Sequence, residues 1–367
     1  MDKIKITNHQ LFSLIANVAL GGSVLIISAL LVSIAKHDAW ITTLLTPLFG
    51  IPIIWVYWFL GSQYPALTFL GIIKKIFGKW IGSIVAAAYV FLCLTISYHL
   101  PWYIGNFISL EAMPETPVYI INSLFVIVMV IAVLYGIETI ARASELFIYL
   151  ASFLYIIAMI FVLPNARIEN LQPVLEKGMI PILKSSVFLS SFIIFPLIIL
   201  MMIYPINLSN ASKAKKSIFK GYLWASFIIF IVIFVTILVL GGITAGLQFP
   251  TYLLAKEINV GIIFTRFEFI IAISWLITEF IVGLIFFYTG VIGLSELLGL
   301  KDHKRIVMPL GLIILIMSGV VFPDVIYQMN WVNLVWPPFI MTYGLILPVL
   351  LLFVFLIKKW VFNGRKG

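Results

Sequence analysis

The chain has 367 residues, of which 63% are hydrophobic and only 10% are charged. A soluble domain carries about 25% charged residues, and a soluble fold of this length could not bury so much apolar surface. We assign the net charge of +9 to cations at the cytoplasmic ends of membrane helices, not to nucleic-acid binding. The composition therefore excludes an ordinary soluble enzyme and favours a multi-pass membrane protein.

The chain contains ten apolar runs of roughly the 20 residues that a helix needs to cross a bilayer. The first run lacks a small-residue cleavage site, and we therefore expect a membrane span there and not a removed signal peptide. The ninth run is the shortest and ends at Pro323 and Asp324. The ten runs cover residues 11–34, 40–60, 80–107, 117–134, 144–163, 182–204, 219–241, 269–292, 306–321 and 335–357.

The basic residues provide an independent signal for the number and direction of the spans. Alternation across ten spans places 17 of the 23 lysines and arginines on the side of the two termini and 6 on the other side. Cytoplasmic loops carry the excess of Lys and Arg. A missed or extra span would mix the two groups, and so the sequence predicts ten spans with both termini cytoplasmic.

Two of the predicted spans contain helix-weakening residues near their centres. The first contains Gly21, Gly22 and Ser23, and the sixth contains Pro196, preceded by Ser190 and Ser191. Matching interruptions in two inverted halves indicate a substrate site at the membrane midplane. Glycine in membrane helices also serves close packing, and proline also produces simple kinks, and so both alternatives stay open for each break.

These features together predict an all-α polytopic membrane protein. We expect ten transmembrane helices in a five-plus-five inverted repeat, with discontinuous first and sixth helices. Residues 1–367 would form one integral membrane domain, with the first repeat at about 8–163 and the second at about 182–359.

Glu279 is the only acidic residue well inside a predicted span. A carboxylate at membrane depth is costly and indicates a functional site. It could couple to protons, bind an ammonium group of a ligand or line a water path. A structural alternative is a neutral carboxyl group that is hydrogen-bonded to a neighbouring helix.

The sequence offers no metal, cofactor or catalytic motif. Cys93 is the single cysteine, which excludes an intrachain disulfide. His99 lies next to Tyr98 in the third predicted span and has no second ligand nearby in the sequence. We find no catalytic triad, phosphate-binding loop or dinucleotide motif, and we therefore expect no enzyme activity, cofactor or metal.

Short blocks along the whole chain resemble the spore germination permease family, the B-subunits of nutrient germinant receptors. The blocks include residues 36–40 (Lys-His-Asp-Ala-Trp), 77–80, 114–117, 136–145, 170–175, 249–251 and 266–268. Each block is short, but their order and spacing extend over nearly the full length.

This resemblance implies a fold like that of the amino-acid, polyamine and organocation transporters. It also implies a nutrient sensor in the spore inner membrane, with an A-subunit and a lipoprotein C-subunit as partners. The nutrient, often an amino acid in this family, would bind where the broken helices meet. By position, the pocket would be lined by Gly21, Gly22, Ser23, Tyr98, Ser190, Ser191, Phe195, Pro196 and Glu279.

Three functions stay open at this stage. The first is a sensor that binds a small nutrient and changes conformation. The second is a proton-coupled or facilitative amino-acid transporter, which would need the same pocket. The third is a channel-like or structural subunit whose ligand binds elsewhere in the complex.

Overall fold

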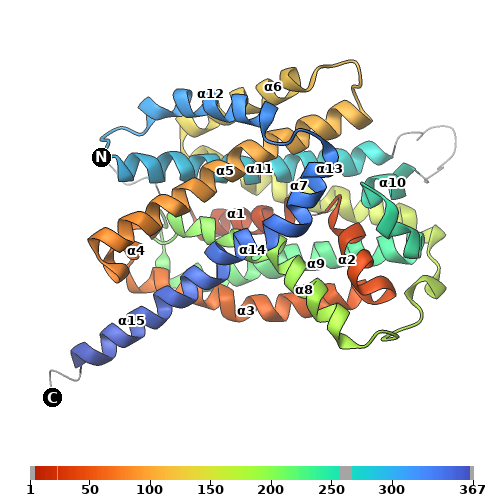
Figure 1. Ribbon diagram of the computed structural model, residues 1–367, viewed down its shortest axis with the longest axis horizontal. Coiled ribbons are helices and arrows are strands. Elements are labelled where there is room, and N and C mark those ends of the chain that lie inside the picture. The colour runs from red at the N-terminus through yellow and green to blue at the C-terminus, as the bar shows by residue number, and fades with distance from the viewer. Residues whose placement is uncertain (1–4, 23, 257–266, 364–367) are drawn as a thin grey trace.

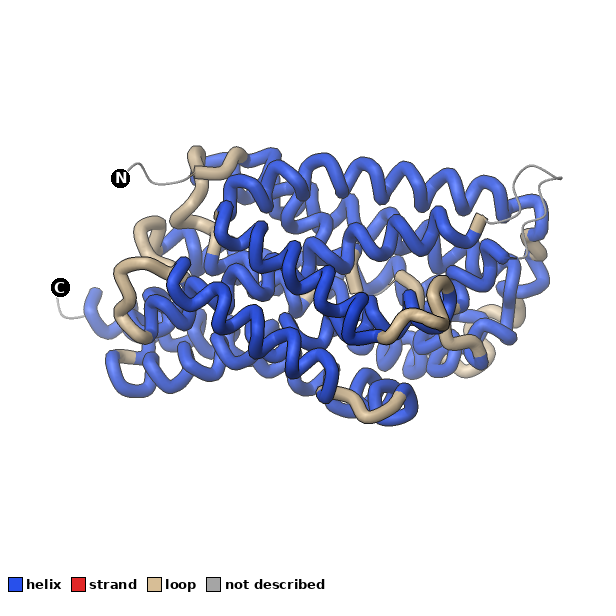
Figure 2. Tube along the Cα trace, turned by 90° about the horizontal axis from the view of Figure 1, so that it is seen from above, coloured by secondary structure: helices blue, strands red, loops and turns tan. Residues whose placement is uncertain are grey.

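The computed structural model describes residues 5–22, 24–256 and 267–363. Helices dominate this part of the chain, in which the only β pairing is an isolated bridge between Ile6 and Leu208. Figure 2 shows the helices joined by loops at their ends. Eight helical segments of the described residues are long and apolar enough to cross a membrane. The chain is therefore a multi-pass, all-helical membrane protein.

The long helices lie nearly parallel along the long axis of the molecule (Figure 1). In the middle, α11 packs against α5 and α7, and α1 packs against α9 and α7. The long helices are α3 (Ala39–Gln63), α5 (Lys79–Glu111), α6 (Val118–Tyr135), α7 (Ile137–Val162), α9 (Ala214–Leu240), α11 (Glu268–Leu297) and α12 (Lys304–Val320). The short helices α4 (Phe69–Phe77) and α10 (Pro250–Lys256) lie between them in the chain.

The first predicted span is divided into α1 (Asn8–Leu20) and α2 (Ile27–Ala35). A capping box begins α1: Thr7 Oγ1 accepts the Gln10 N–H at 3.1 Å, and Gln10 Oε1 accepts the Thr7 N–H at 2.9 Å. The helix ends where the predicted break begins, and Gly22 has a φ of 78°. Glycine adopts this backbone conformation without the steric cost that a Cβ would bring.

The sixth predicted span changes its helix type near its middle. It begins as α8 (Met179–Ile193) and continues as a 3-10 helix, η4 (Phe195–Met202). Pro196 has no backbone N–H and stands in the first turn of η4, where proline needs no intrahelical partner. A 3-10 helix of eight residues is unusual, because its hydrogen bonds have poorer geometry than those of an α-helix. The predicted break at Pro196 therefore takes the form of a tighter helix.

The last predicted span, 335–357, lies within a longer helix that has two π-helical turns. This helix consists of α13 (Val325–Asn330), a π turn η7 (Trp331–Val335), α14 (Trp336–Met341), a second π turn η8 (Thr342–Ile346) and α15 (Leu347–Asn363). It crosses obliquely in front of the other helices in Figure 1. Tyr57 of α3 donates a hydrogen bond to the carbonyl of Gly344 in the second π turn.

Two predicted spans do not form candidate segments of their own. The first is interrupted after the 13 residues of α1, and its second half, α2, belongs with α3 to the candidate segment Ile27–Gln63. The ninth corresponds to α12, which has 17 residues. The structure therefore supports at least eight membrane segments, while the count of ten and the inverted repeat stay predictions. These two segments fall short in length only. The first is shortened by the helix break, and the ninth is a short apolar run.

Hydrogen bonds tie the first described residues to the end of the sixth span. The N–H of Ile6 donates to the carbonyl of Asn207 at 2.7 Å, and its carbonyl accepts the N–H of Ser209 at 3.0 Å. Near the other terminus, Lys358 Nζ of α15 donates to the carbonyl of Ile76 in α4 at 2.6 Å. Both ends of the described chain are thus fixed to connections between spans.

Candidate functional site

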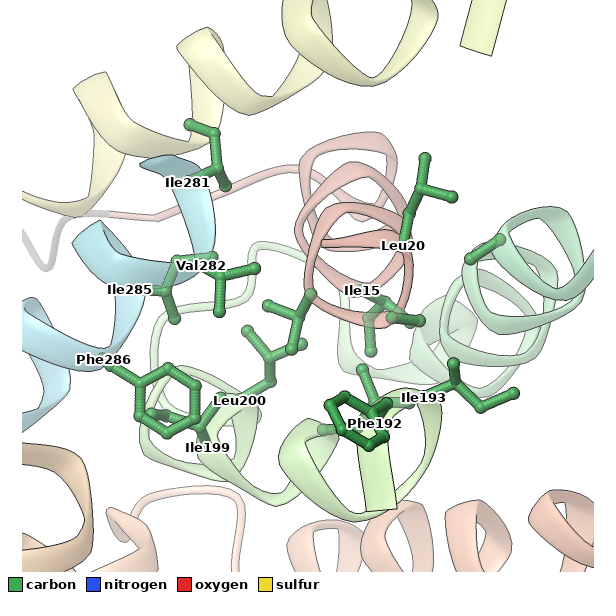
Figure 3. Close-up of a cluster of buried hydrophobic side chains, with 14 of the residues drawn as sticks. Ile15, Leu20, Phe192, Ile193, Ile199, Leu200, Ile281, Val282, Ile285 and Phe286 are labelled. Atoms are coloured by element: carbon green, nitrogen blue, oxygen red, sulfur yellow. The ribbon is translucent and has the colours of Figure 1, made fainter. Parts of the chain in front are cut away.

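A cavity of about 460 Å³ lies where the two broken helices meet. Its wall is formed by the break between α1 and α2, by α5, α8 and η4, by residues 245–249 and by α11 and the first π turn. Cavities of about 300–1,000 Å³ are typical of small-molecule sites. Figure 3 shows buried apolar side chains of α1, α8, η4 and α11 near the two breaks.

The glycine pair lets α1 approach α11 closely. A Cβ on Gly21 would lie 2.9 Å from the carbonyl oxygen of Thr278, a distance that real Cβ atoms do not show. A Cβ on Gly22 would lie 3.5 Å from Glu279 Oε2. Both glycines line the cavity. The first break therefore serves close packing at Gly21 and unwinding at Gly22.

Glu279 lies on α11 and faces the cavity while its side chain is almost completely buried. Only 2% of the residue is exposed. Its Oε2 has no hydrogen-bond partner among the described residues. A buried polar atom without a partner costs about 1–3 kcal/mol, and more when it is charged. The site thus holds a carboxyl oxygen that is available to a ligand, an ion or water.

An aromatic cluster covers one side of the cavity around His99 of α5. The His99 ring stacks on Trp331 of the π turn, with ring centroids 5.1 Å apart, and lies 4.9 Å from the ring of Phe322. Phe322 also contacts Trp102 edge to face at 4.9 Å. These contacts join the third predicted span to the last one. They place His99, Trp102 and Trp331 in the cavity wall.

The structure brings together four of the predicted site residues, namely Gly21, Gly22, Pro196 and Glu279, all of which line the cavity. Ser23 lies outside the described residues. The other four predicted residues, Tyr98, Ser190, Ser191 and Phe195, are not part of the lining.

Local contacts explain why these four residues lie elsewhere. Ser190 Oγ donates to the carbonyl of Ser186, and Ser191 Oγ donates to that of Phe188. Both hydroxyl groups therefore form their hydrogen bonds with the backbone of α8. Phe195 packs against Gly344 of the second π turn. Tyr98 stacks on His99 with ring centroids 4.9 Å apart.

Several lining residues were not predicted from the sequence, mainly aromatic and amide side chains. On α5, His99, Tyr103 and Asn106 follow one another at spacings of four and three residues, which places them on one helix face. This spacing could have indicated them. The unpredicted polar and aromatic lining residues include His99, Trp102, Tyr103, Asn106, Gln248, Trp275, Gln328, Trp331, Asn333 and Trp336.

No group of three or more His, Cys, Asp or Glu residues that could hold a metal ion occurs within the described ranges. Cys93 is buried in α5 and is not part of the cavity lining. The chemistry that this lining offers is binding: an acceptor carboxyl, aromatic faces and a few amides.

Comparison with solved structures places the fold among transporters. Mhp1, a nucleobase-cation-symport-1 family transporter in a closed conformation with bromovinylhydantoin bound, superimposes with a TM-score of 0.65 and 12% identity, over 90% of this chain and 75% of Mhp1. MhsT in complex with L-phenylalanine gives a TM-score of 0.62 and 14% identity, over 97% of this chain and 99% of MhsT. At sequence identities this low, the structural similarity shows a shared fold and nothing about the ligand or the activity.

Sequence comparison shows closer relatives. Spore germination protein KB of Bacillus subtilis (strain 168) is 28% identical over 371 residues, covering 100% of this chain and 98% of that protein. Spore germination protein A2 of the same organism is 26% identical, with 97% of each chain covered. The sequence model of the spore permease family, described as spore germination protein, matches residues 5–322. The chain therefore belongs to the spore permease family of spore germination proteins.

Proposed function

We propose that this protein is the nutrient-sensing subunit of a spore germinant receptor and binds a small nutrient in the cavity at the broken helices. It would lie in the spore inner membrane with both termini on the cytoplasmic side. An amino acid is the expected nutrient, and an A-subunit and a lipoprotein C-subunit are the expected partners. The role is binding and conformational change, not catalysis.

The observation that carries this proposal is the cavity itself. It lies at the break of the first span and at Pro196 of the sixth, and its wall holds a carboxyl oxygen without a protein partner among the described residues. Unwound backbone at membrane depth is tolerated where it lines a cavity. Family membership supports the link to germination, and the fold shared with transporters supports a small-molecule ligand.

Gly22→Leu tests this proposal. The substituted residue would have to adopt a φ of 78° with its Cβ 3.5 Å from Glu279 Oε2, and so its side chain would fill the cavity beside the carboxyl group. We expect spores carrying the variant to lose their response to the nutrient, and the purified variant to lose the ligand-dependent rise in melting temperature that binding to the folded state produces.

Gly319→Leu is the matched control. Gly319 lies on α12, where an added Cβ would meet nothing within 4 Å, and it does not line the cavity. This variant should respond as the unchanged chain does. A normal nutrient response from Gly22→Leu, at normal protein abundance, would contradict the proposed site.

A transporter is the second candidate, because both solved neighbours named above share its fold and one of them is a symporter. Accumulation of an amino acid against its gradient in vesicles that contain only this chain would favour transport over sensing. A channel-like or structural subunit is the third candidate. It would be favoured if no nutrient bound the purified chain while spores still required the chain for germination.

A further inference from the structure

The charge of the cavity wall is unbalanced. Glu279 is the only Asp, Glu, Lys or Arg residue among the described residues that line the cavity. Its helix supplies no neighbouring cation, because α11 (Glu268–Leu297) contains no Lys or Arg. The carboxyl group interacts with the backbone N–H of Gly22, but its Oε2 has no partner among the described residues, and an ionised carboxylate without a counter-charge in this position would be strongly unfavourable. A positively charged ligand group would supply that counter-charge.

His99 adds a second acceptor and no positive charge of its own. Its Nδ1 lies 2.6 Å from the carbonyl oxygen of Thr95. Since a carbonyl only accepts hydrogen bonds, Nδ1 carries the proton, and in the neutral ring Nε2 is an acceptor. The described part of the chain offers Nε2 no hydrogen-bond partner. Two acceptors in one cavity suit a ligand group with several N–H donors, and an ammonium group has three.

The aromatic side chains of the wall favour the same class of ligand. Trp275 lies one helical turn before Glu279 on α11, and both line the cavity. Trp102 and Trp331 approach from α5 and the first π turn. Aromatic faces attract cations, with tryptophan the strongest of the three aromatic types. The same rings provide apolar contact for the body of the ligand.

The hydrogen-bond donor that the cavity wall offers, the indole N–H of Trp336, suits an uncharged oxygen atom of the ligand. Nε1 of Trp336 is buried without a hydrogen-bond partner within the described ranges. Trp336 lies beside Phe192 of α8, with ring centroids 6.1 Å apart, and Figure 3 places Phe192 across from the α11 side chains Val282 and Phe286. An indole N–H can donate to an ether, hydroxyl or amide oxygen, whereas no Lys or Arg of the described lining offers a ligand carboxylate a counter-charge.

We propose that this cavity selects its ligand through an ammonium group held by Glu279, and that a carboxylate on the ligand is not required. The ligand class is a primary amine with an apolar or aromatic body. This inference rests on the proposed function, because it names the chemical class recognised at the same site. It predicts that simple amines bind and that the matching carboxylic acids do not.

The test uses four probes that share one aromatic body: 2-phenylethylamine, L-phenylalanine, phenylacetate and 2-phenylethanol. Dissociation constants are measured with the full chain in lipid nanodiscs. We expect 2-phenylethylamine to bind and phenylacetate not to bind. Glu279→Gln should weaken 2-phenylethylamine at least tenfold and leave the affinity for the neutral 2-phenylethanol unchanged. A general loss of folding would weaken both probes, and so the pair separates recognition from stability.

Glu296→Gln is the matched control, because it makes the same chemical change on the same helix. Glu296 accepts a hydrogen bond from Thr68 at 2.7 Å and does not line the cavity. This variant should bind 2-phenylethylamine as the unchanged chain does.

Four results would overturn the inference: no binding of 2-phenylethylamine, binding of L-phenylalanine alone, binding of phenylacetate as tightly as the amine, or a Glu279→Gln variant with unchanged affinity for the amine. None of them removes the proposed function, which fails separately if Gly22→Leu leaves the nutrient response of spores intact.

Discussion

Gly344 is the contact point between the last span and the 3-10 part of the sixth span. It lies in the second π turn, where its carbonyl accepts the hydrogen bond from Tyr57. A Cβ at this position would lie 2.5 Å from the Cα and the carbonyl oxygen of Phe195. Backbone atoms cannot move aside as a flexible side chain can, and so this contact requires glycine.

We expect Gly344→Ala to lower the free energy of unfolding by about 1–3 kcal/mol, the usual cost of forcing extra volume into a packed site. Thermal unfolding in detergent measures the effect. Gly319→Ala should be neutral or slightly stabilising, because its Cβ meets nothing within 4 Å and alanine is the better helix former. Equal melting temperatures for the two variants would show that the π turn moves away from Phe195 without cost.

The sequence predicts some single residues of the site and not others, for physical reasons. Glu279 and Gly22 stand out because an acid and a glycine pair are unusual inside apolar spans. His99 and Trp331 do not, because each alone is an ordinary membrane residue. Their contact joins positions that are 232 residues apart, and no local pattern encodes it. Ser190 and Ser191 lie outside the lining, and their hydroxyl groups donate to carbonyls of their own helix, as serine in a helix often does.

The connection between the fifth and sixth predicted spans is an ordered element, although it has little regular structure. Asn170 Nδ2 donates to the carbonyls of Leu238 and Val239 at 2.8 and 3.2 Å. The backbone carbonyl oxygen of Asn170 lies 3.0 Å from Nδ1 of His37. Asp38 Oδ1 accepts the N–H of Leu175 at 2.8 Å. The loop is thereby fixed to the ends of α9 and α2.

Asn170→Ala should release this loop. We expect backbone amides of residues 166–178 to exchange with deuterium at least several-fold faster, because local opening then costs less. Asn165→Ala is the matched control, since Asn165 is exposed and lies in the same connection. Unchanged exchange in Asn170→Ala would mean that the hydrogen bonds retained in the variant hold the loop without the Asn170 side chain; these bonds are those of Asp38, of His37 to the backbone carbonyl of residue 170 and of the Arg167 N–H to Leu238.

At the scale of the elements, the predicted breaks could be located but their form could not. The sequence places the interruption of the first span at residues 21–23, and α1 indeed ends at Leu20. Proline predicts a kink in the sixth span, whereas the structure has eight residues of 3-10 helix. The π turns of the last span were not predicted, because a π turn has no distinctive local composition. Each turn contains a residue that packs against another span, Trp331 against His99 and Gly344 against Phe195.

The whole molecule is suited to a labelling test of its orientation. Cys93 is the only cysteine of the chain and is completely buried. Introduced cysteines would therefore be the only accessible thiols. Glu169 and Ser212 are both exposed and lie on either side of the membrane segment Met179–Met202.

With cytoplasmic termini, Glu169→Cys should react with a membrane-impermeant maleimide in intact cells that carry the chain in their inner membrane, after the outer layers are removed. Ser212→Cys should react only after permeabilisation. The unchanged chain, which retains Cys93, provides the unlabelled control. The reverse pattern would mean that the termini lie on the outer side, and equal labelling would mean that the segment does not cross.

At this scale the composition was sufficient for the membrane class, and the ordered blocks of sequence were sufficient for the family. The inverted repeat is a different case. It is a relation between two halves of the chain that share little sequence, and helix lengths alone do not test it. The eight candidate segments establish a multi-pass protein, whereas the ten-span topology depends on the short helices α1 and α12.

The first π turn has a consequence for how one wall of the cavity could be altered. A π turn holds one residue more than the α-helical turn that it replaces. It absorbs this extra residue locally, and so the helix on either side keeps its register. Deleting one residue from Trp331–Val335 would therefore restore a regular helix without rotating the residues that follow, such as Trp336. The side chains of the turn itself would point in new directions, and this part of the cavity wall would change while the other spans kept their places.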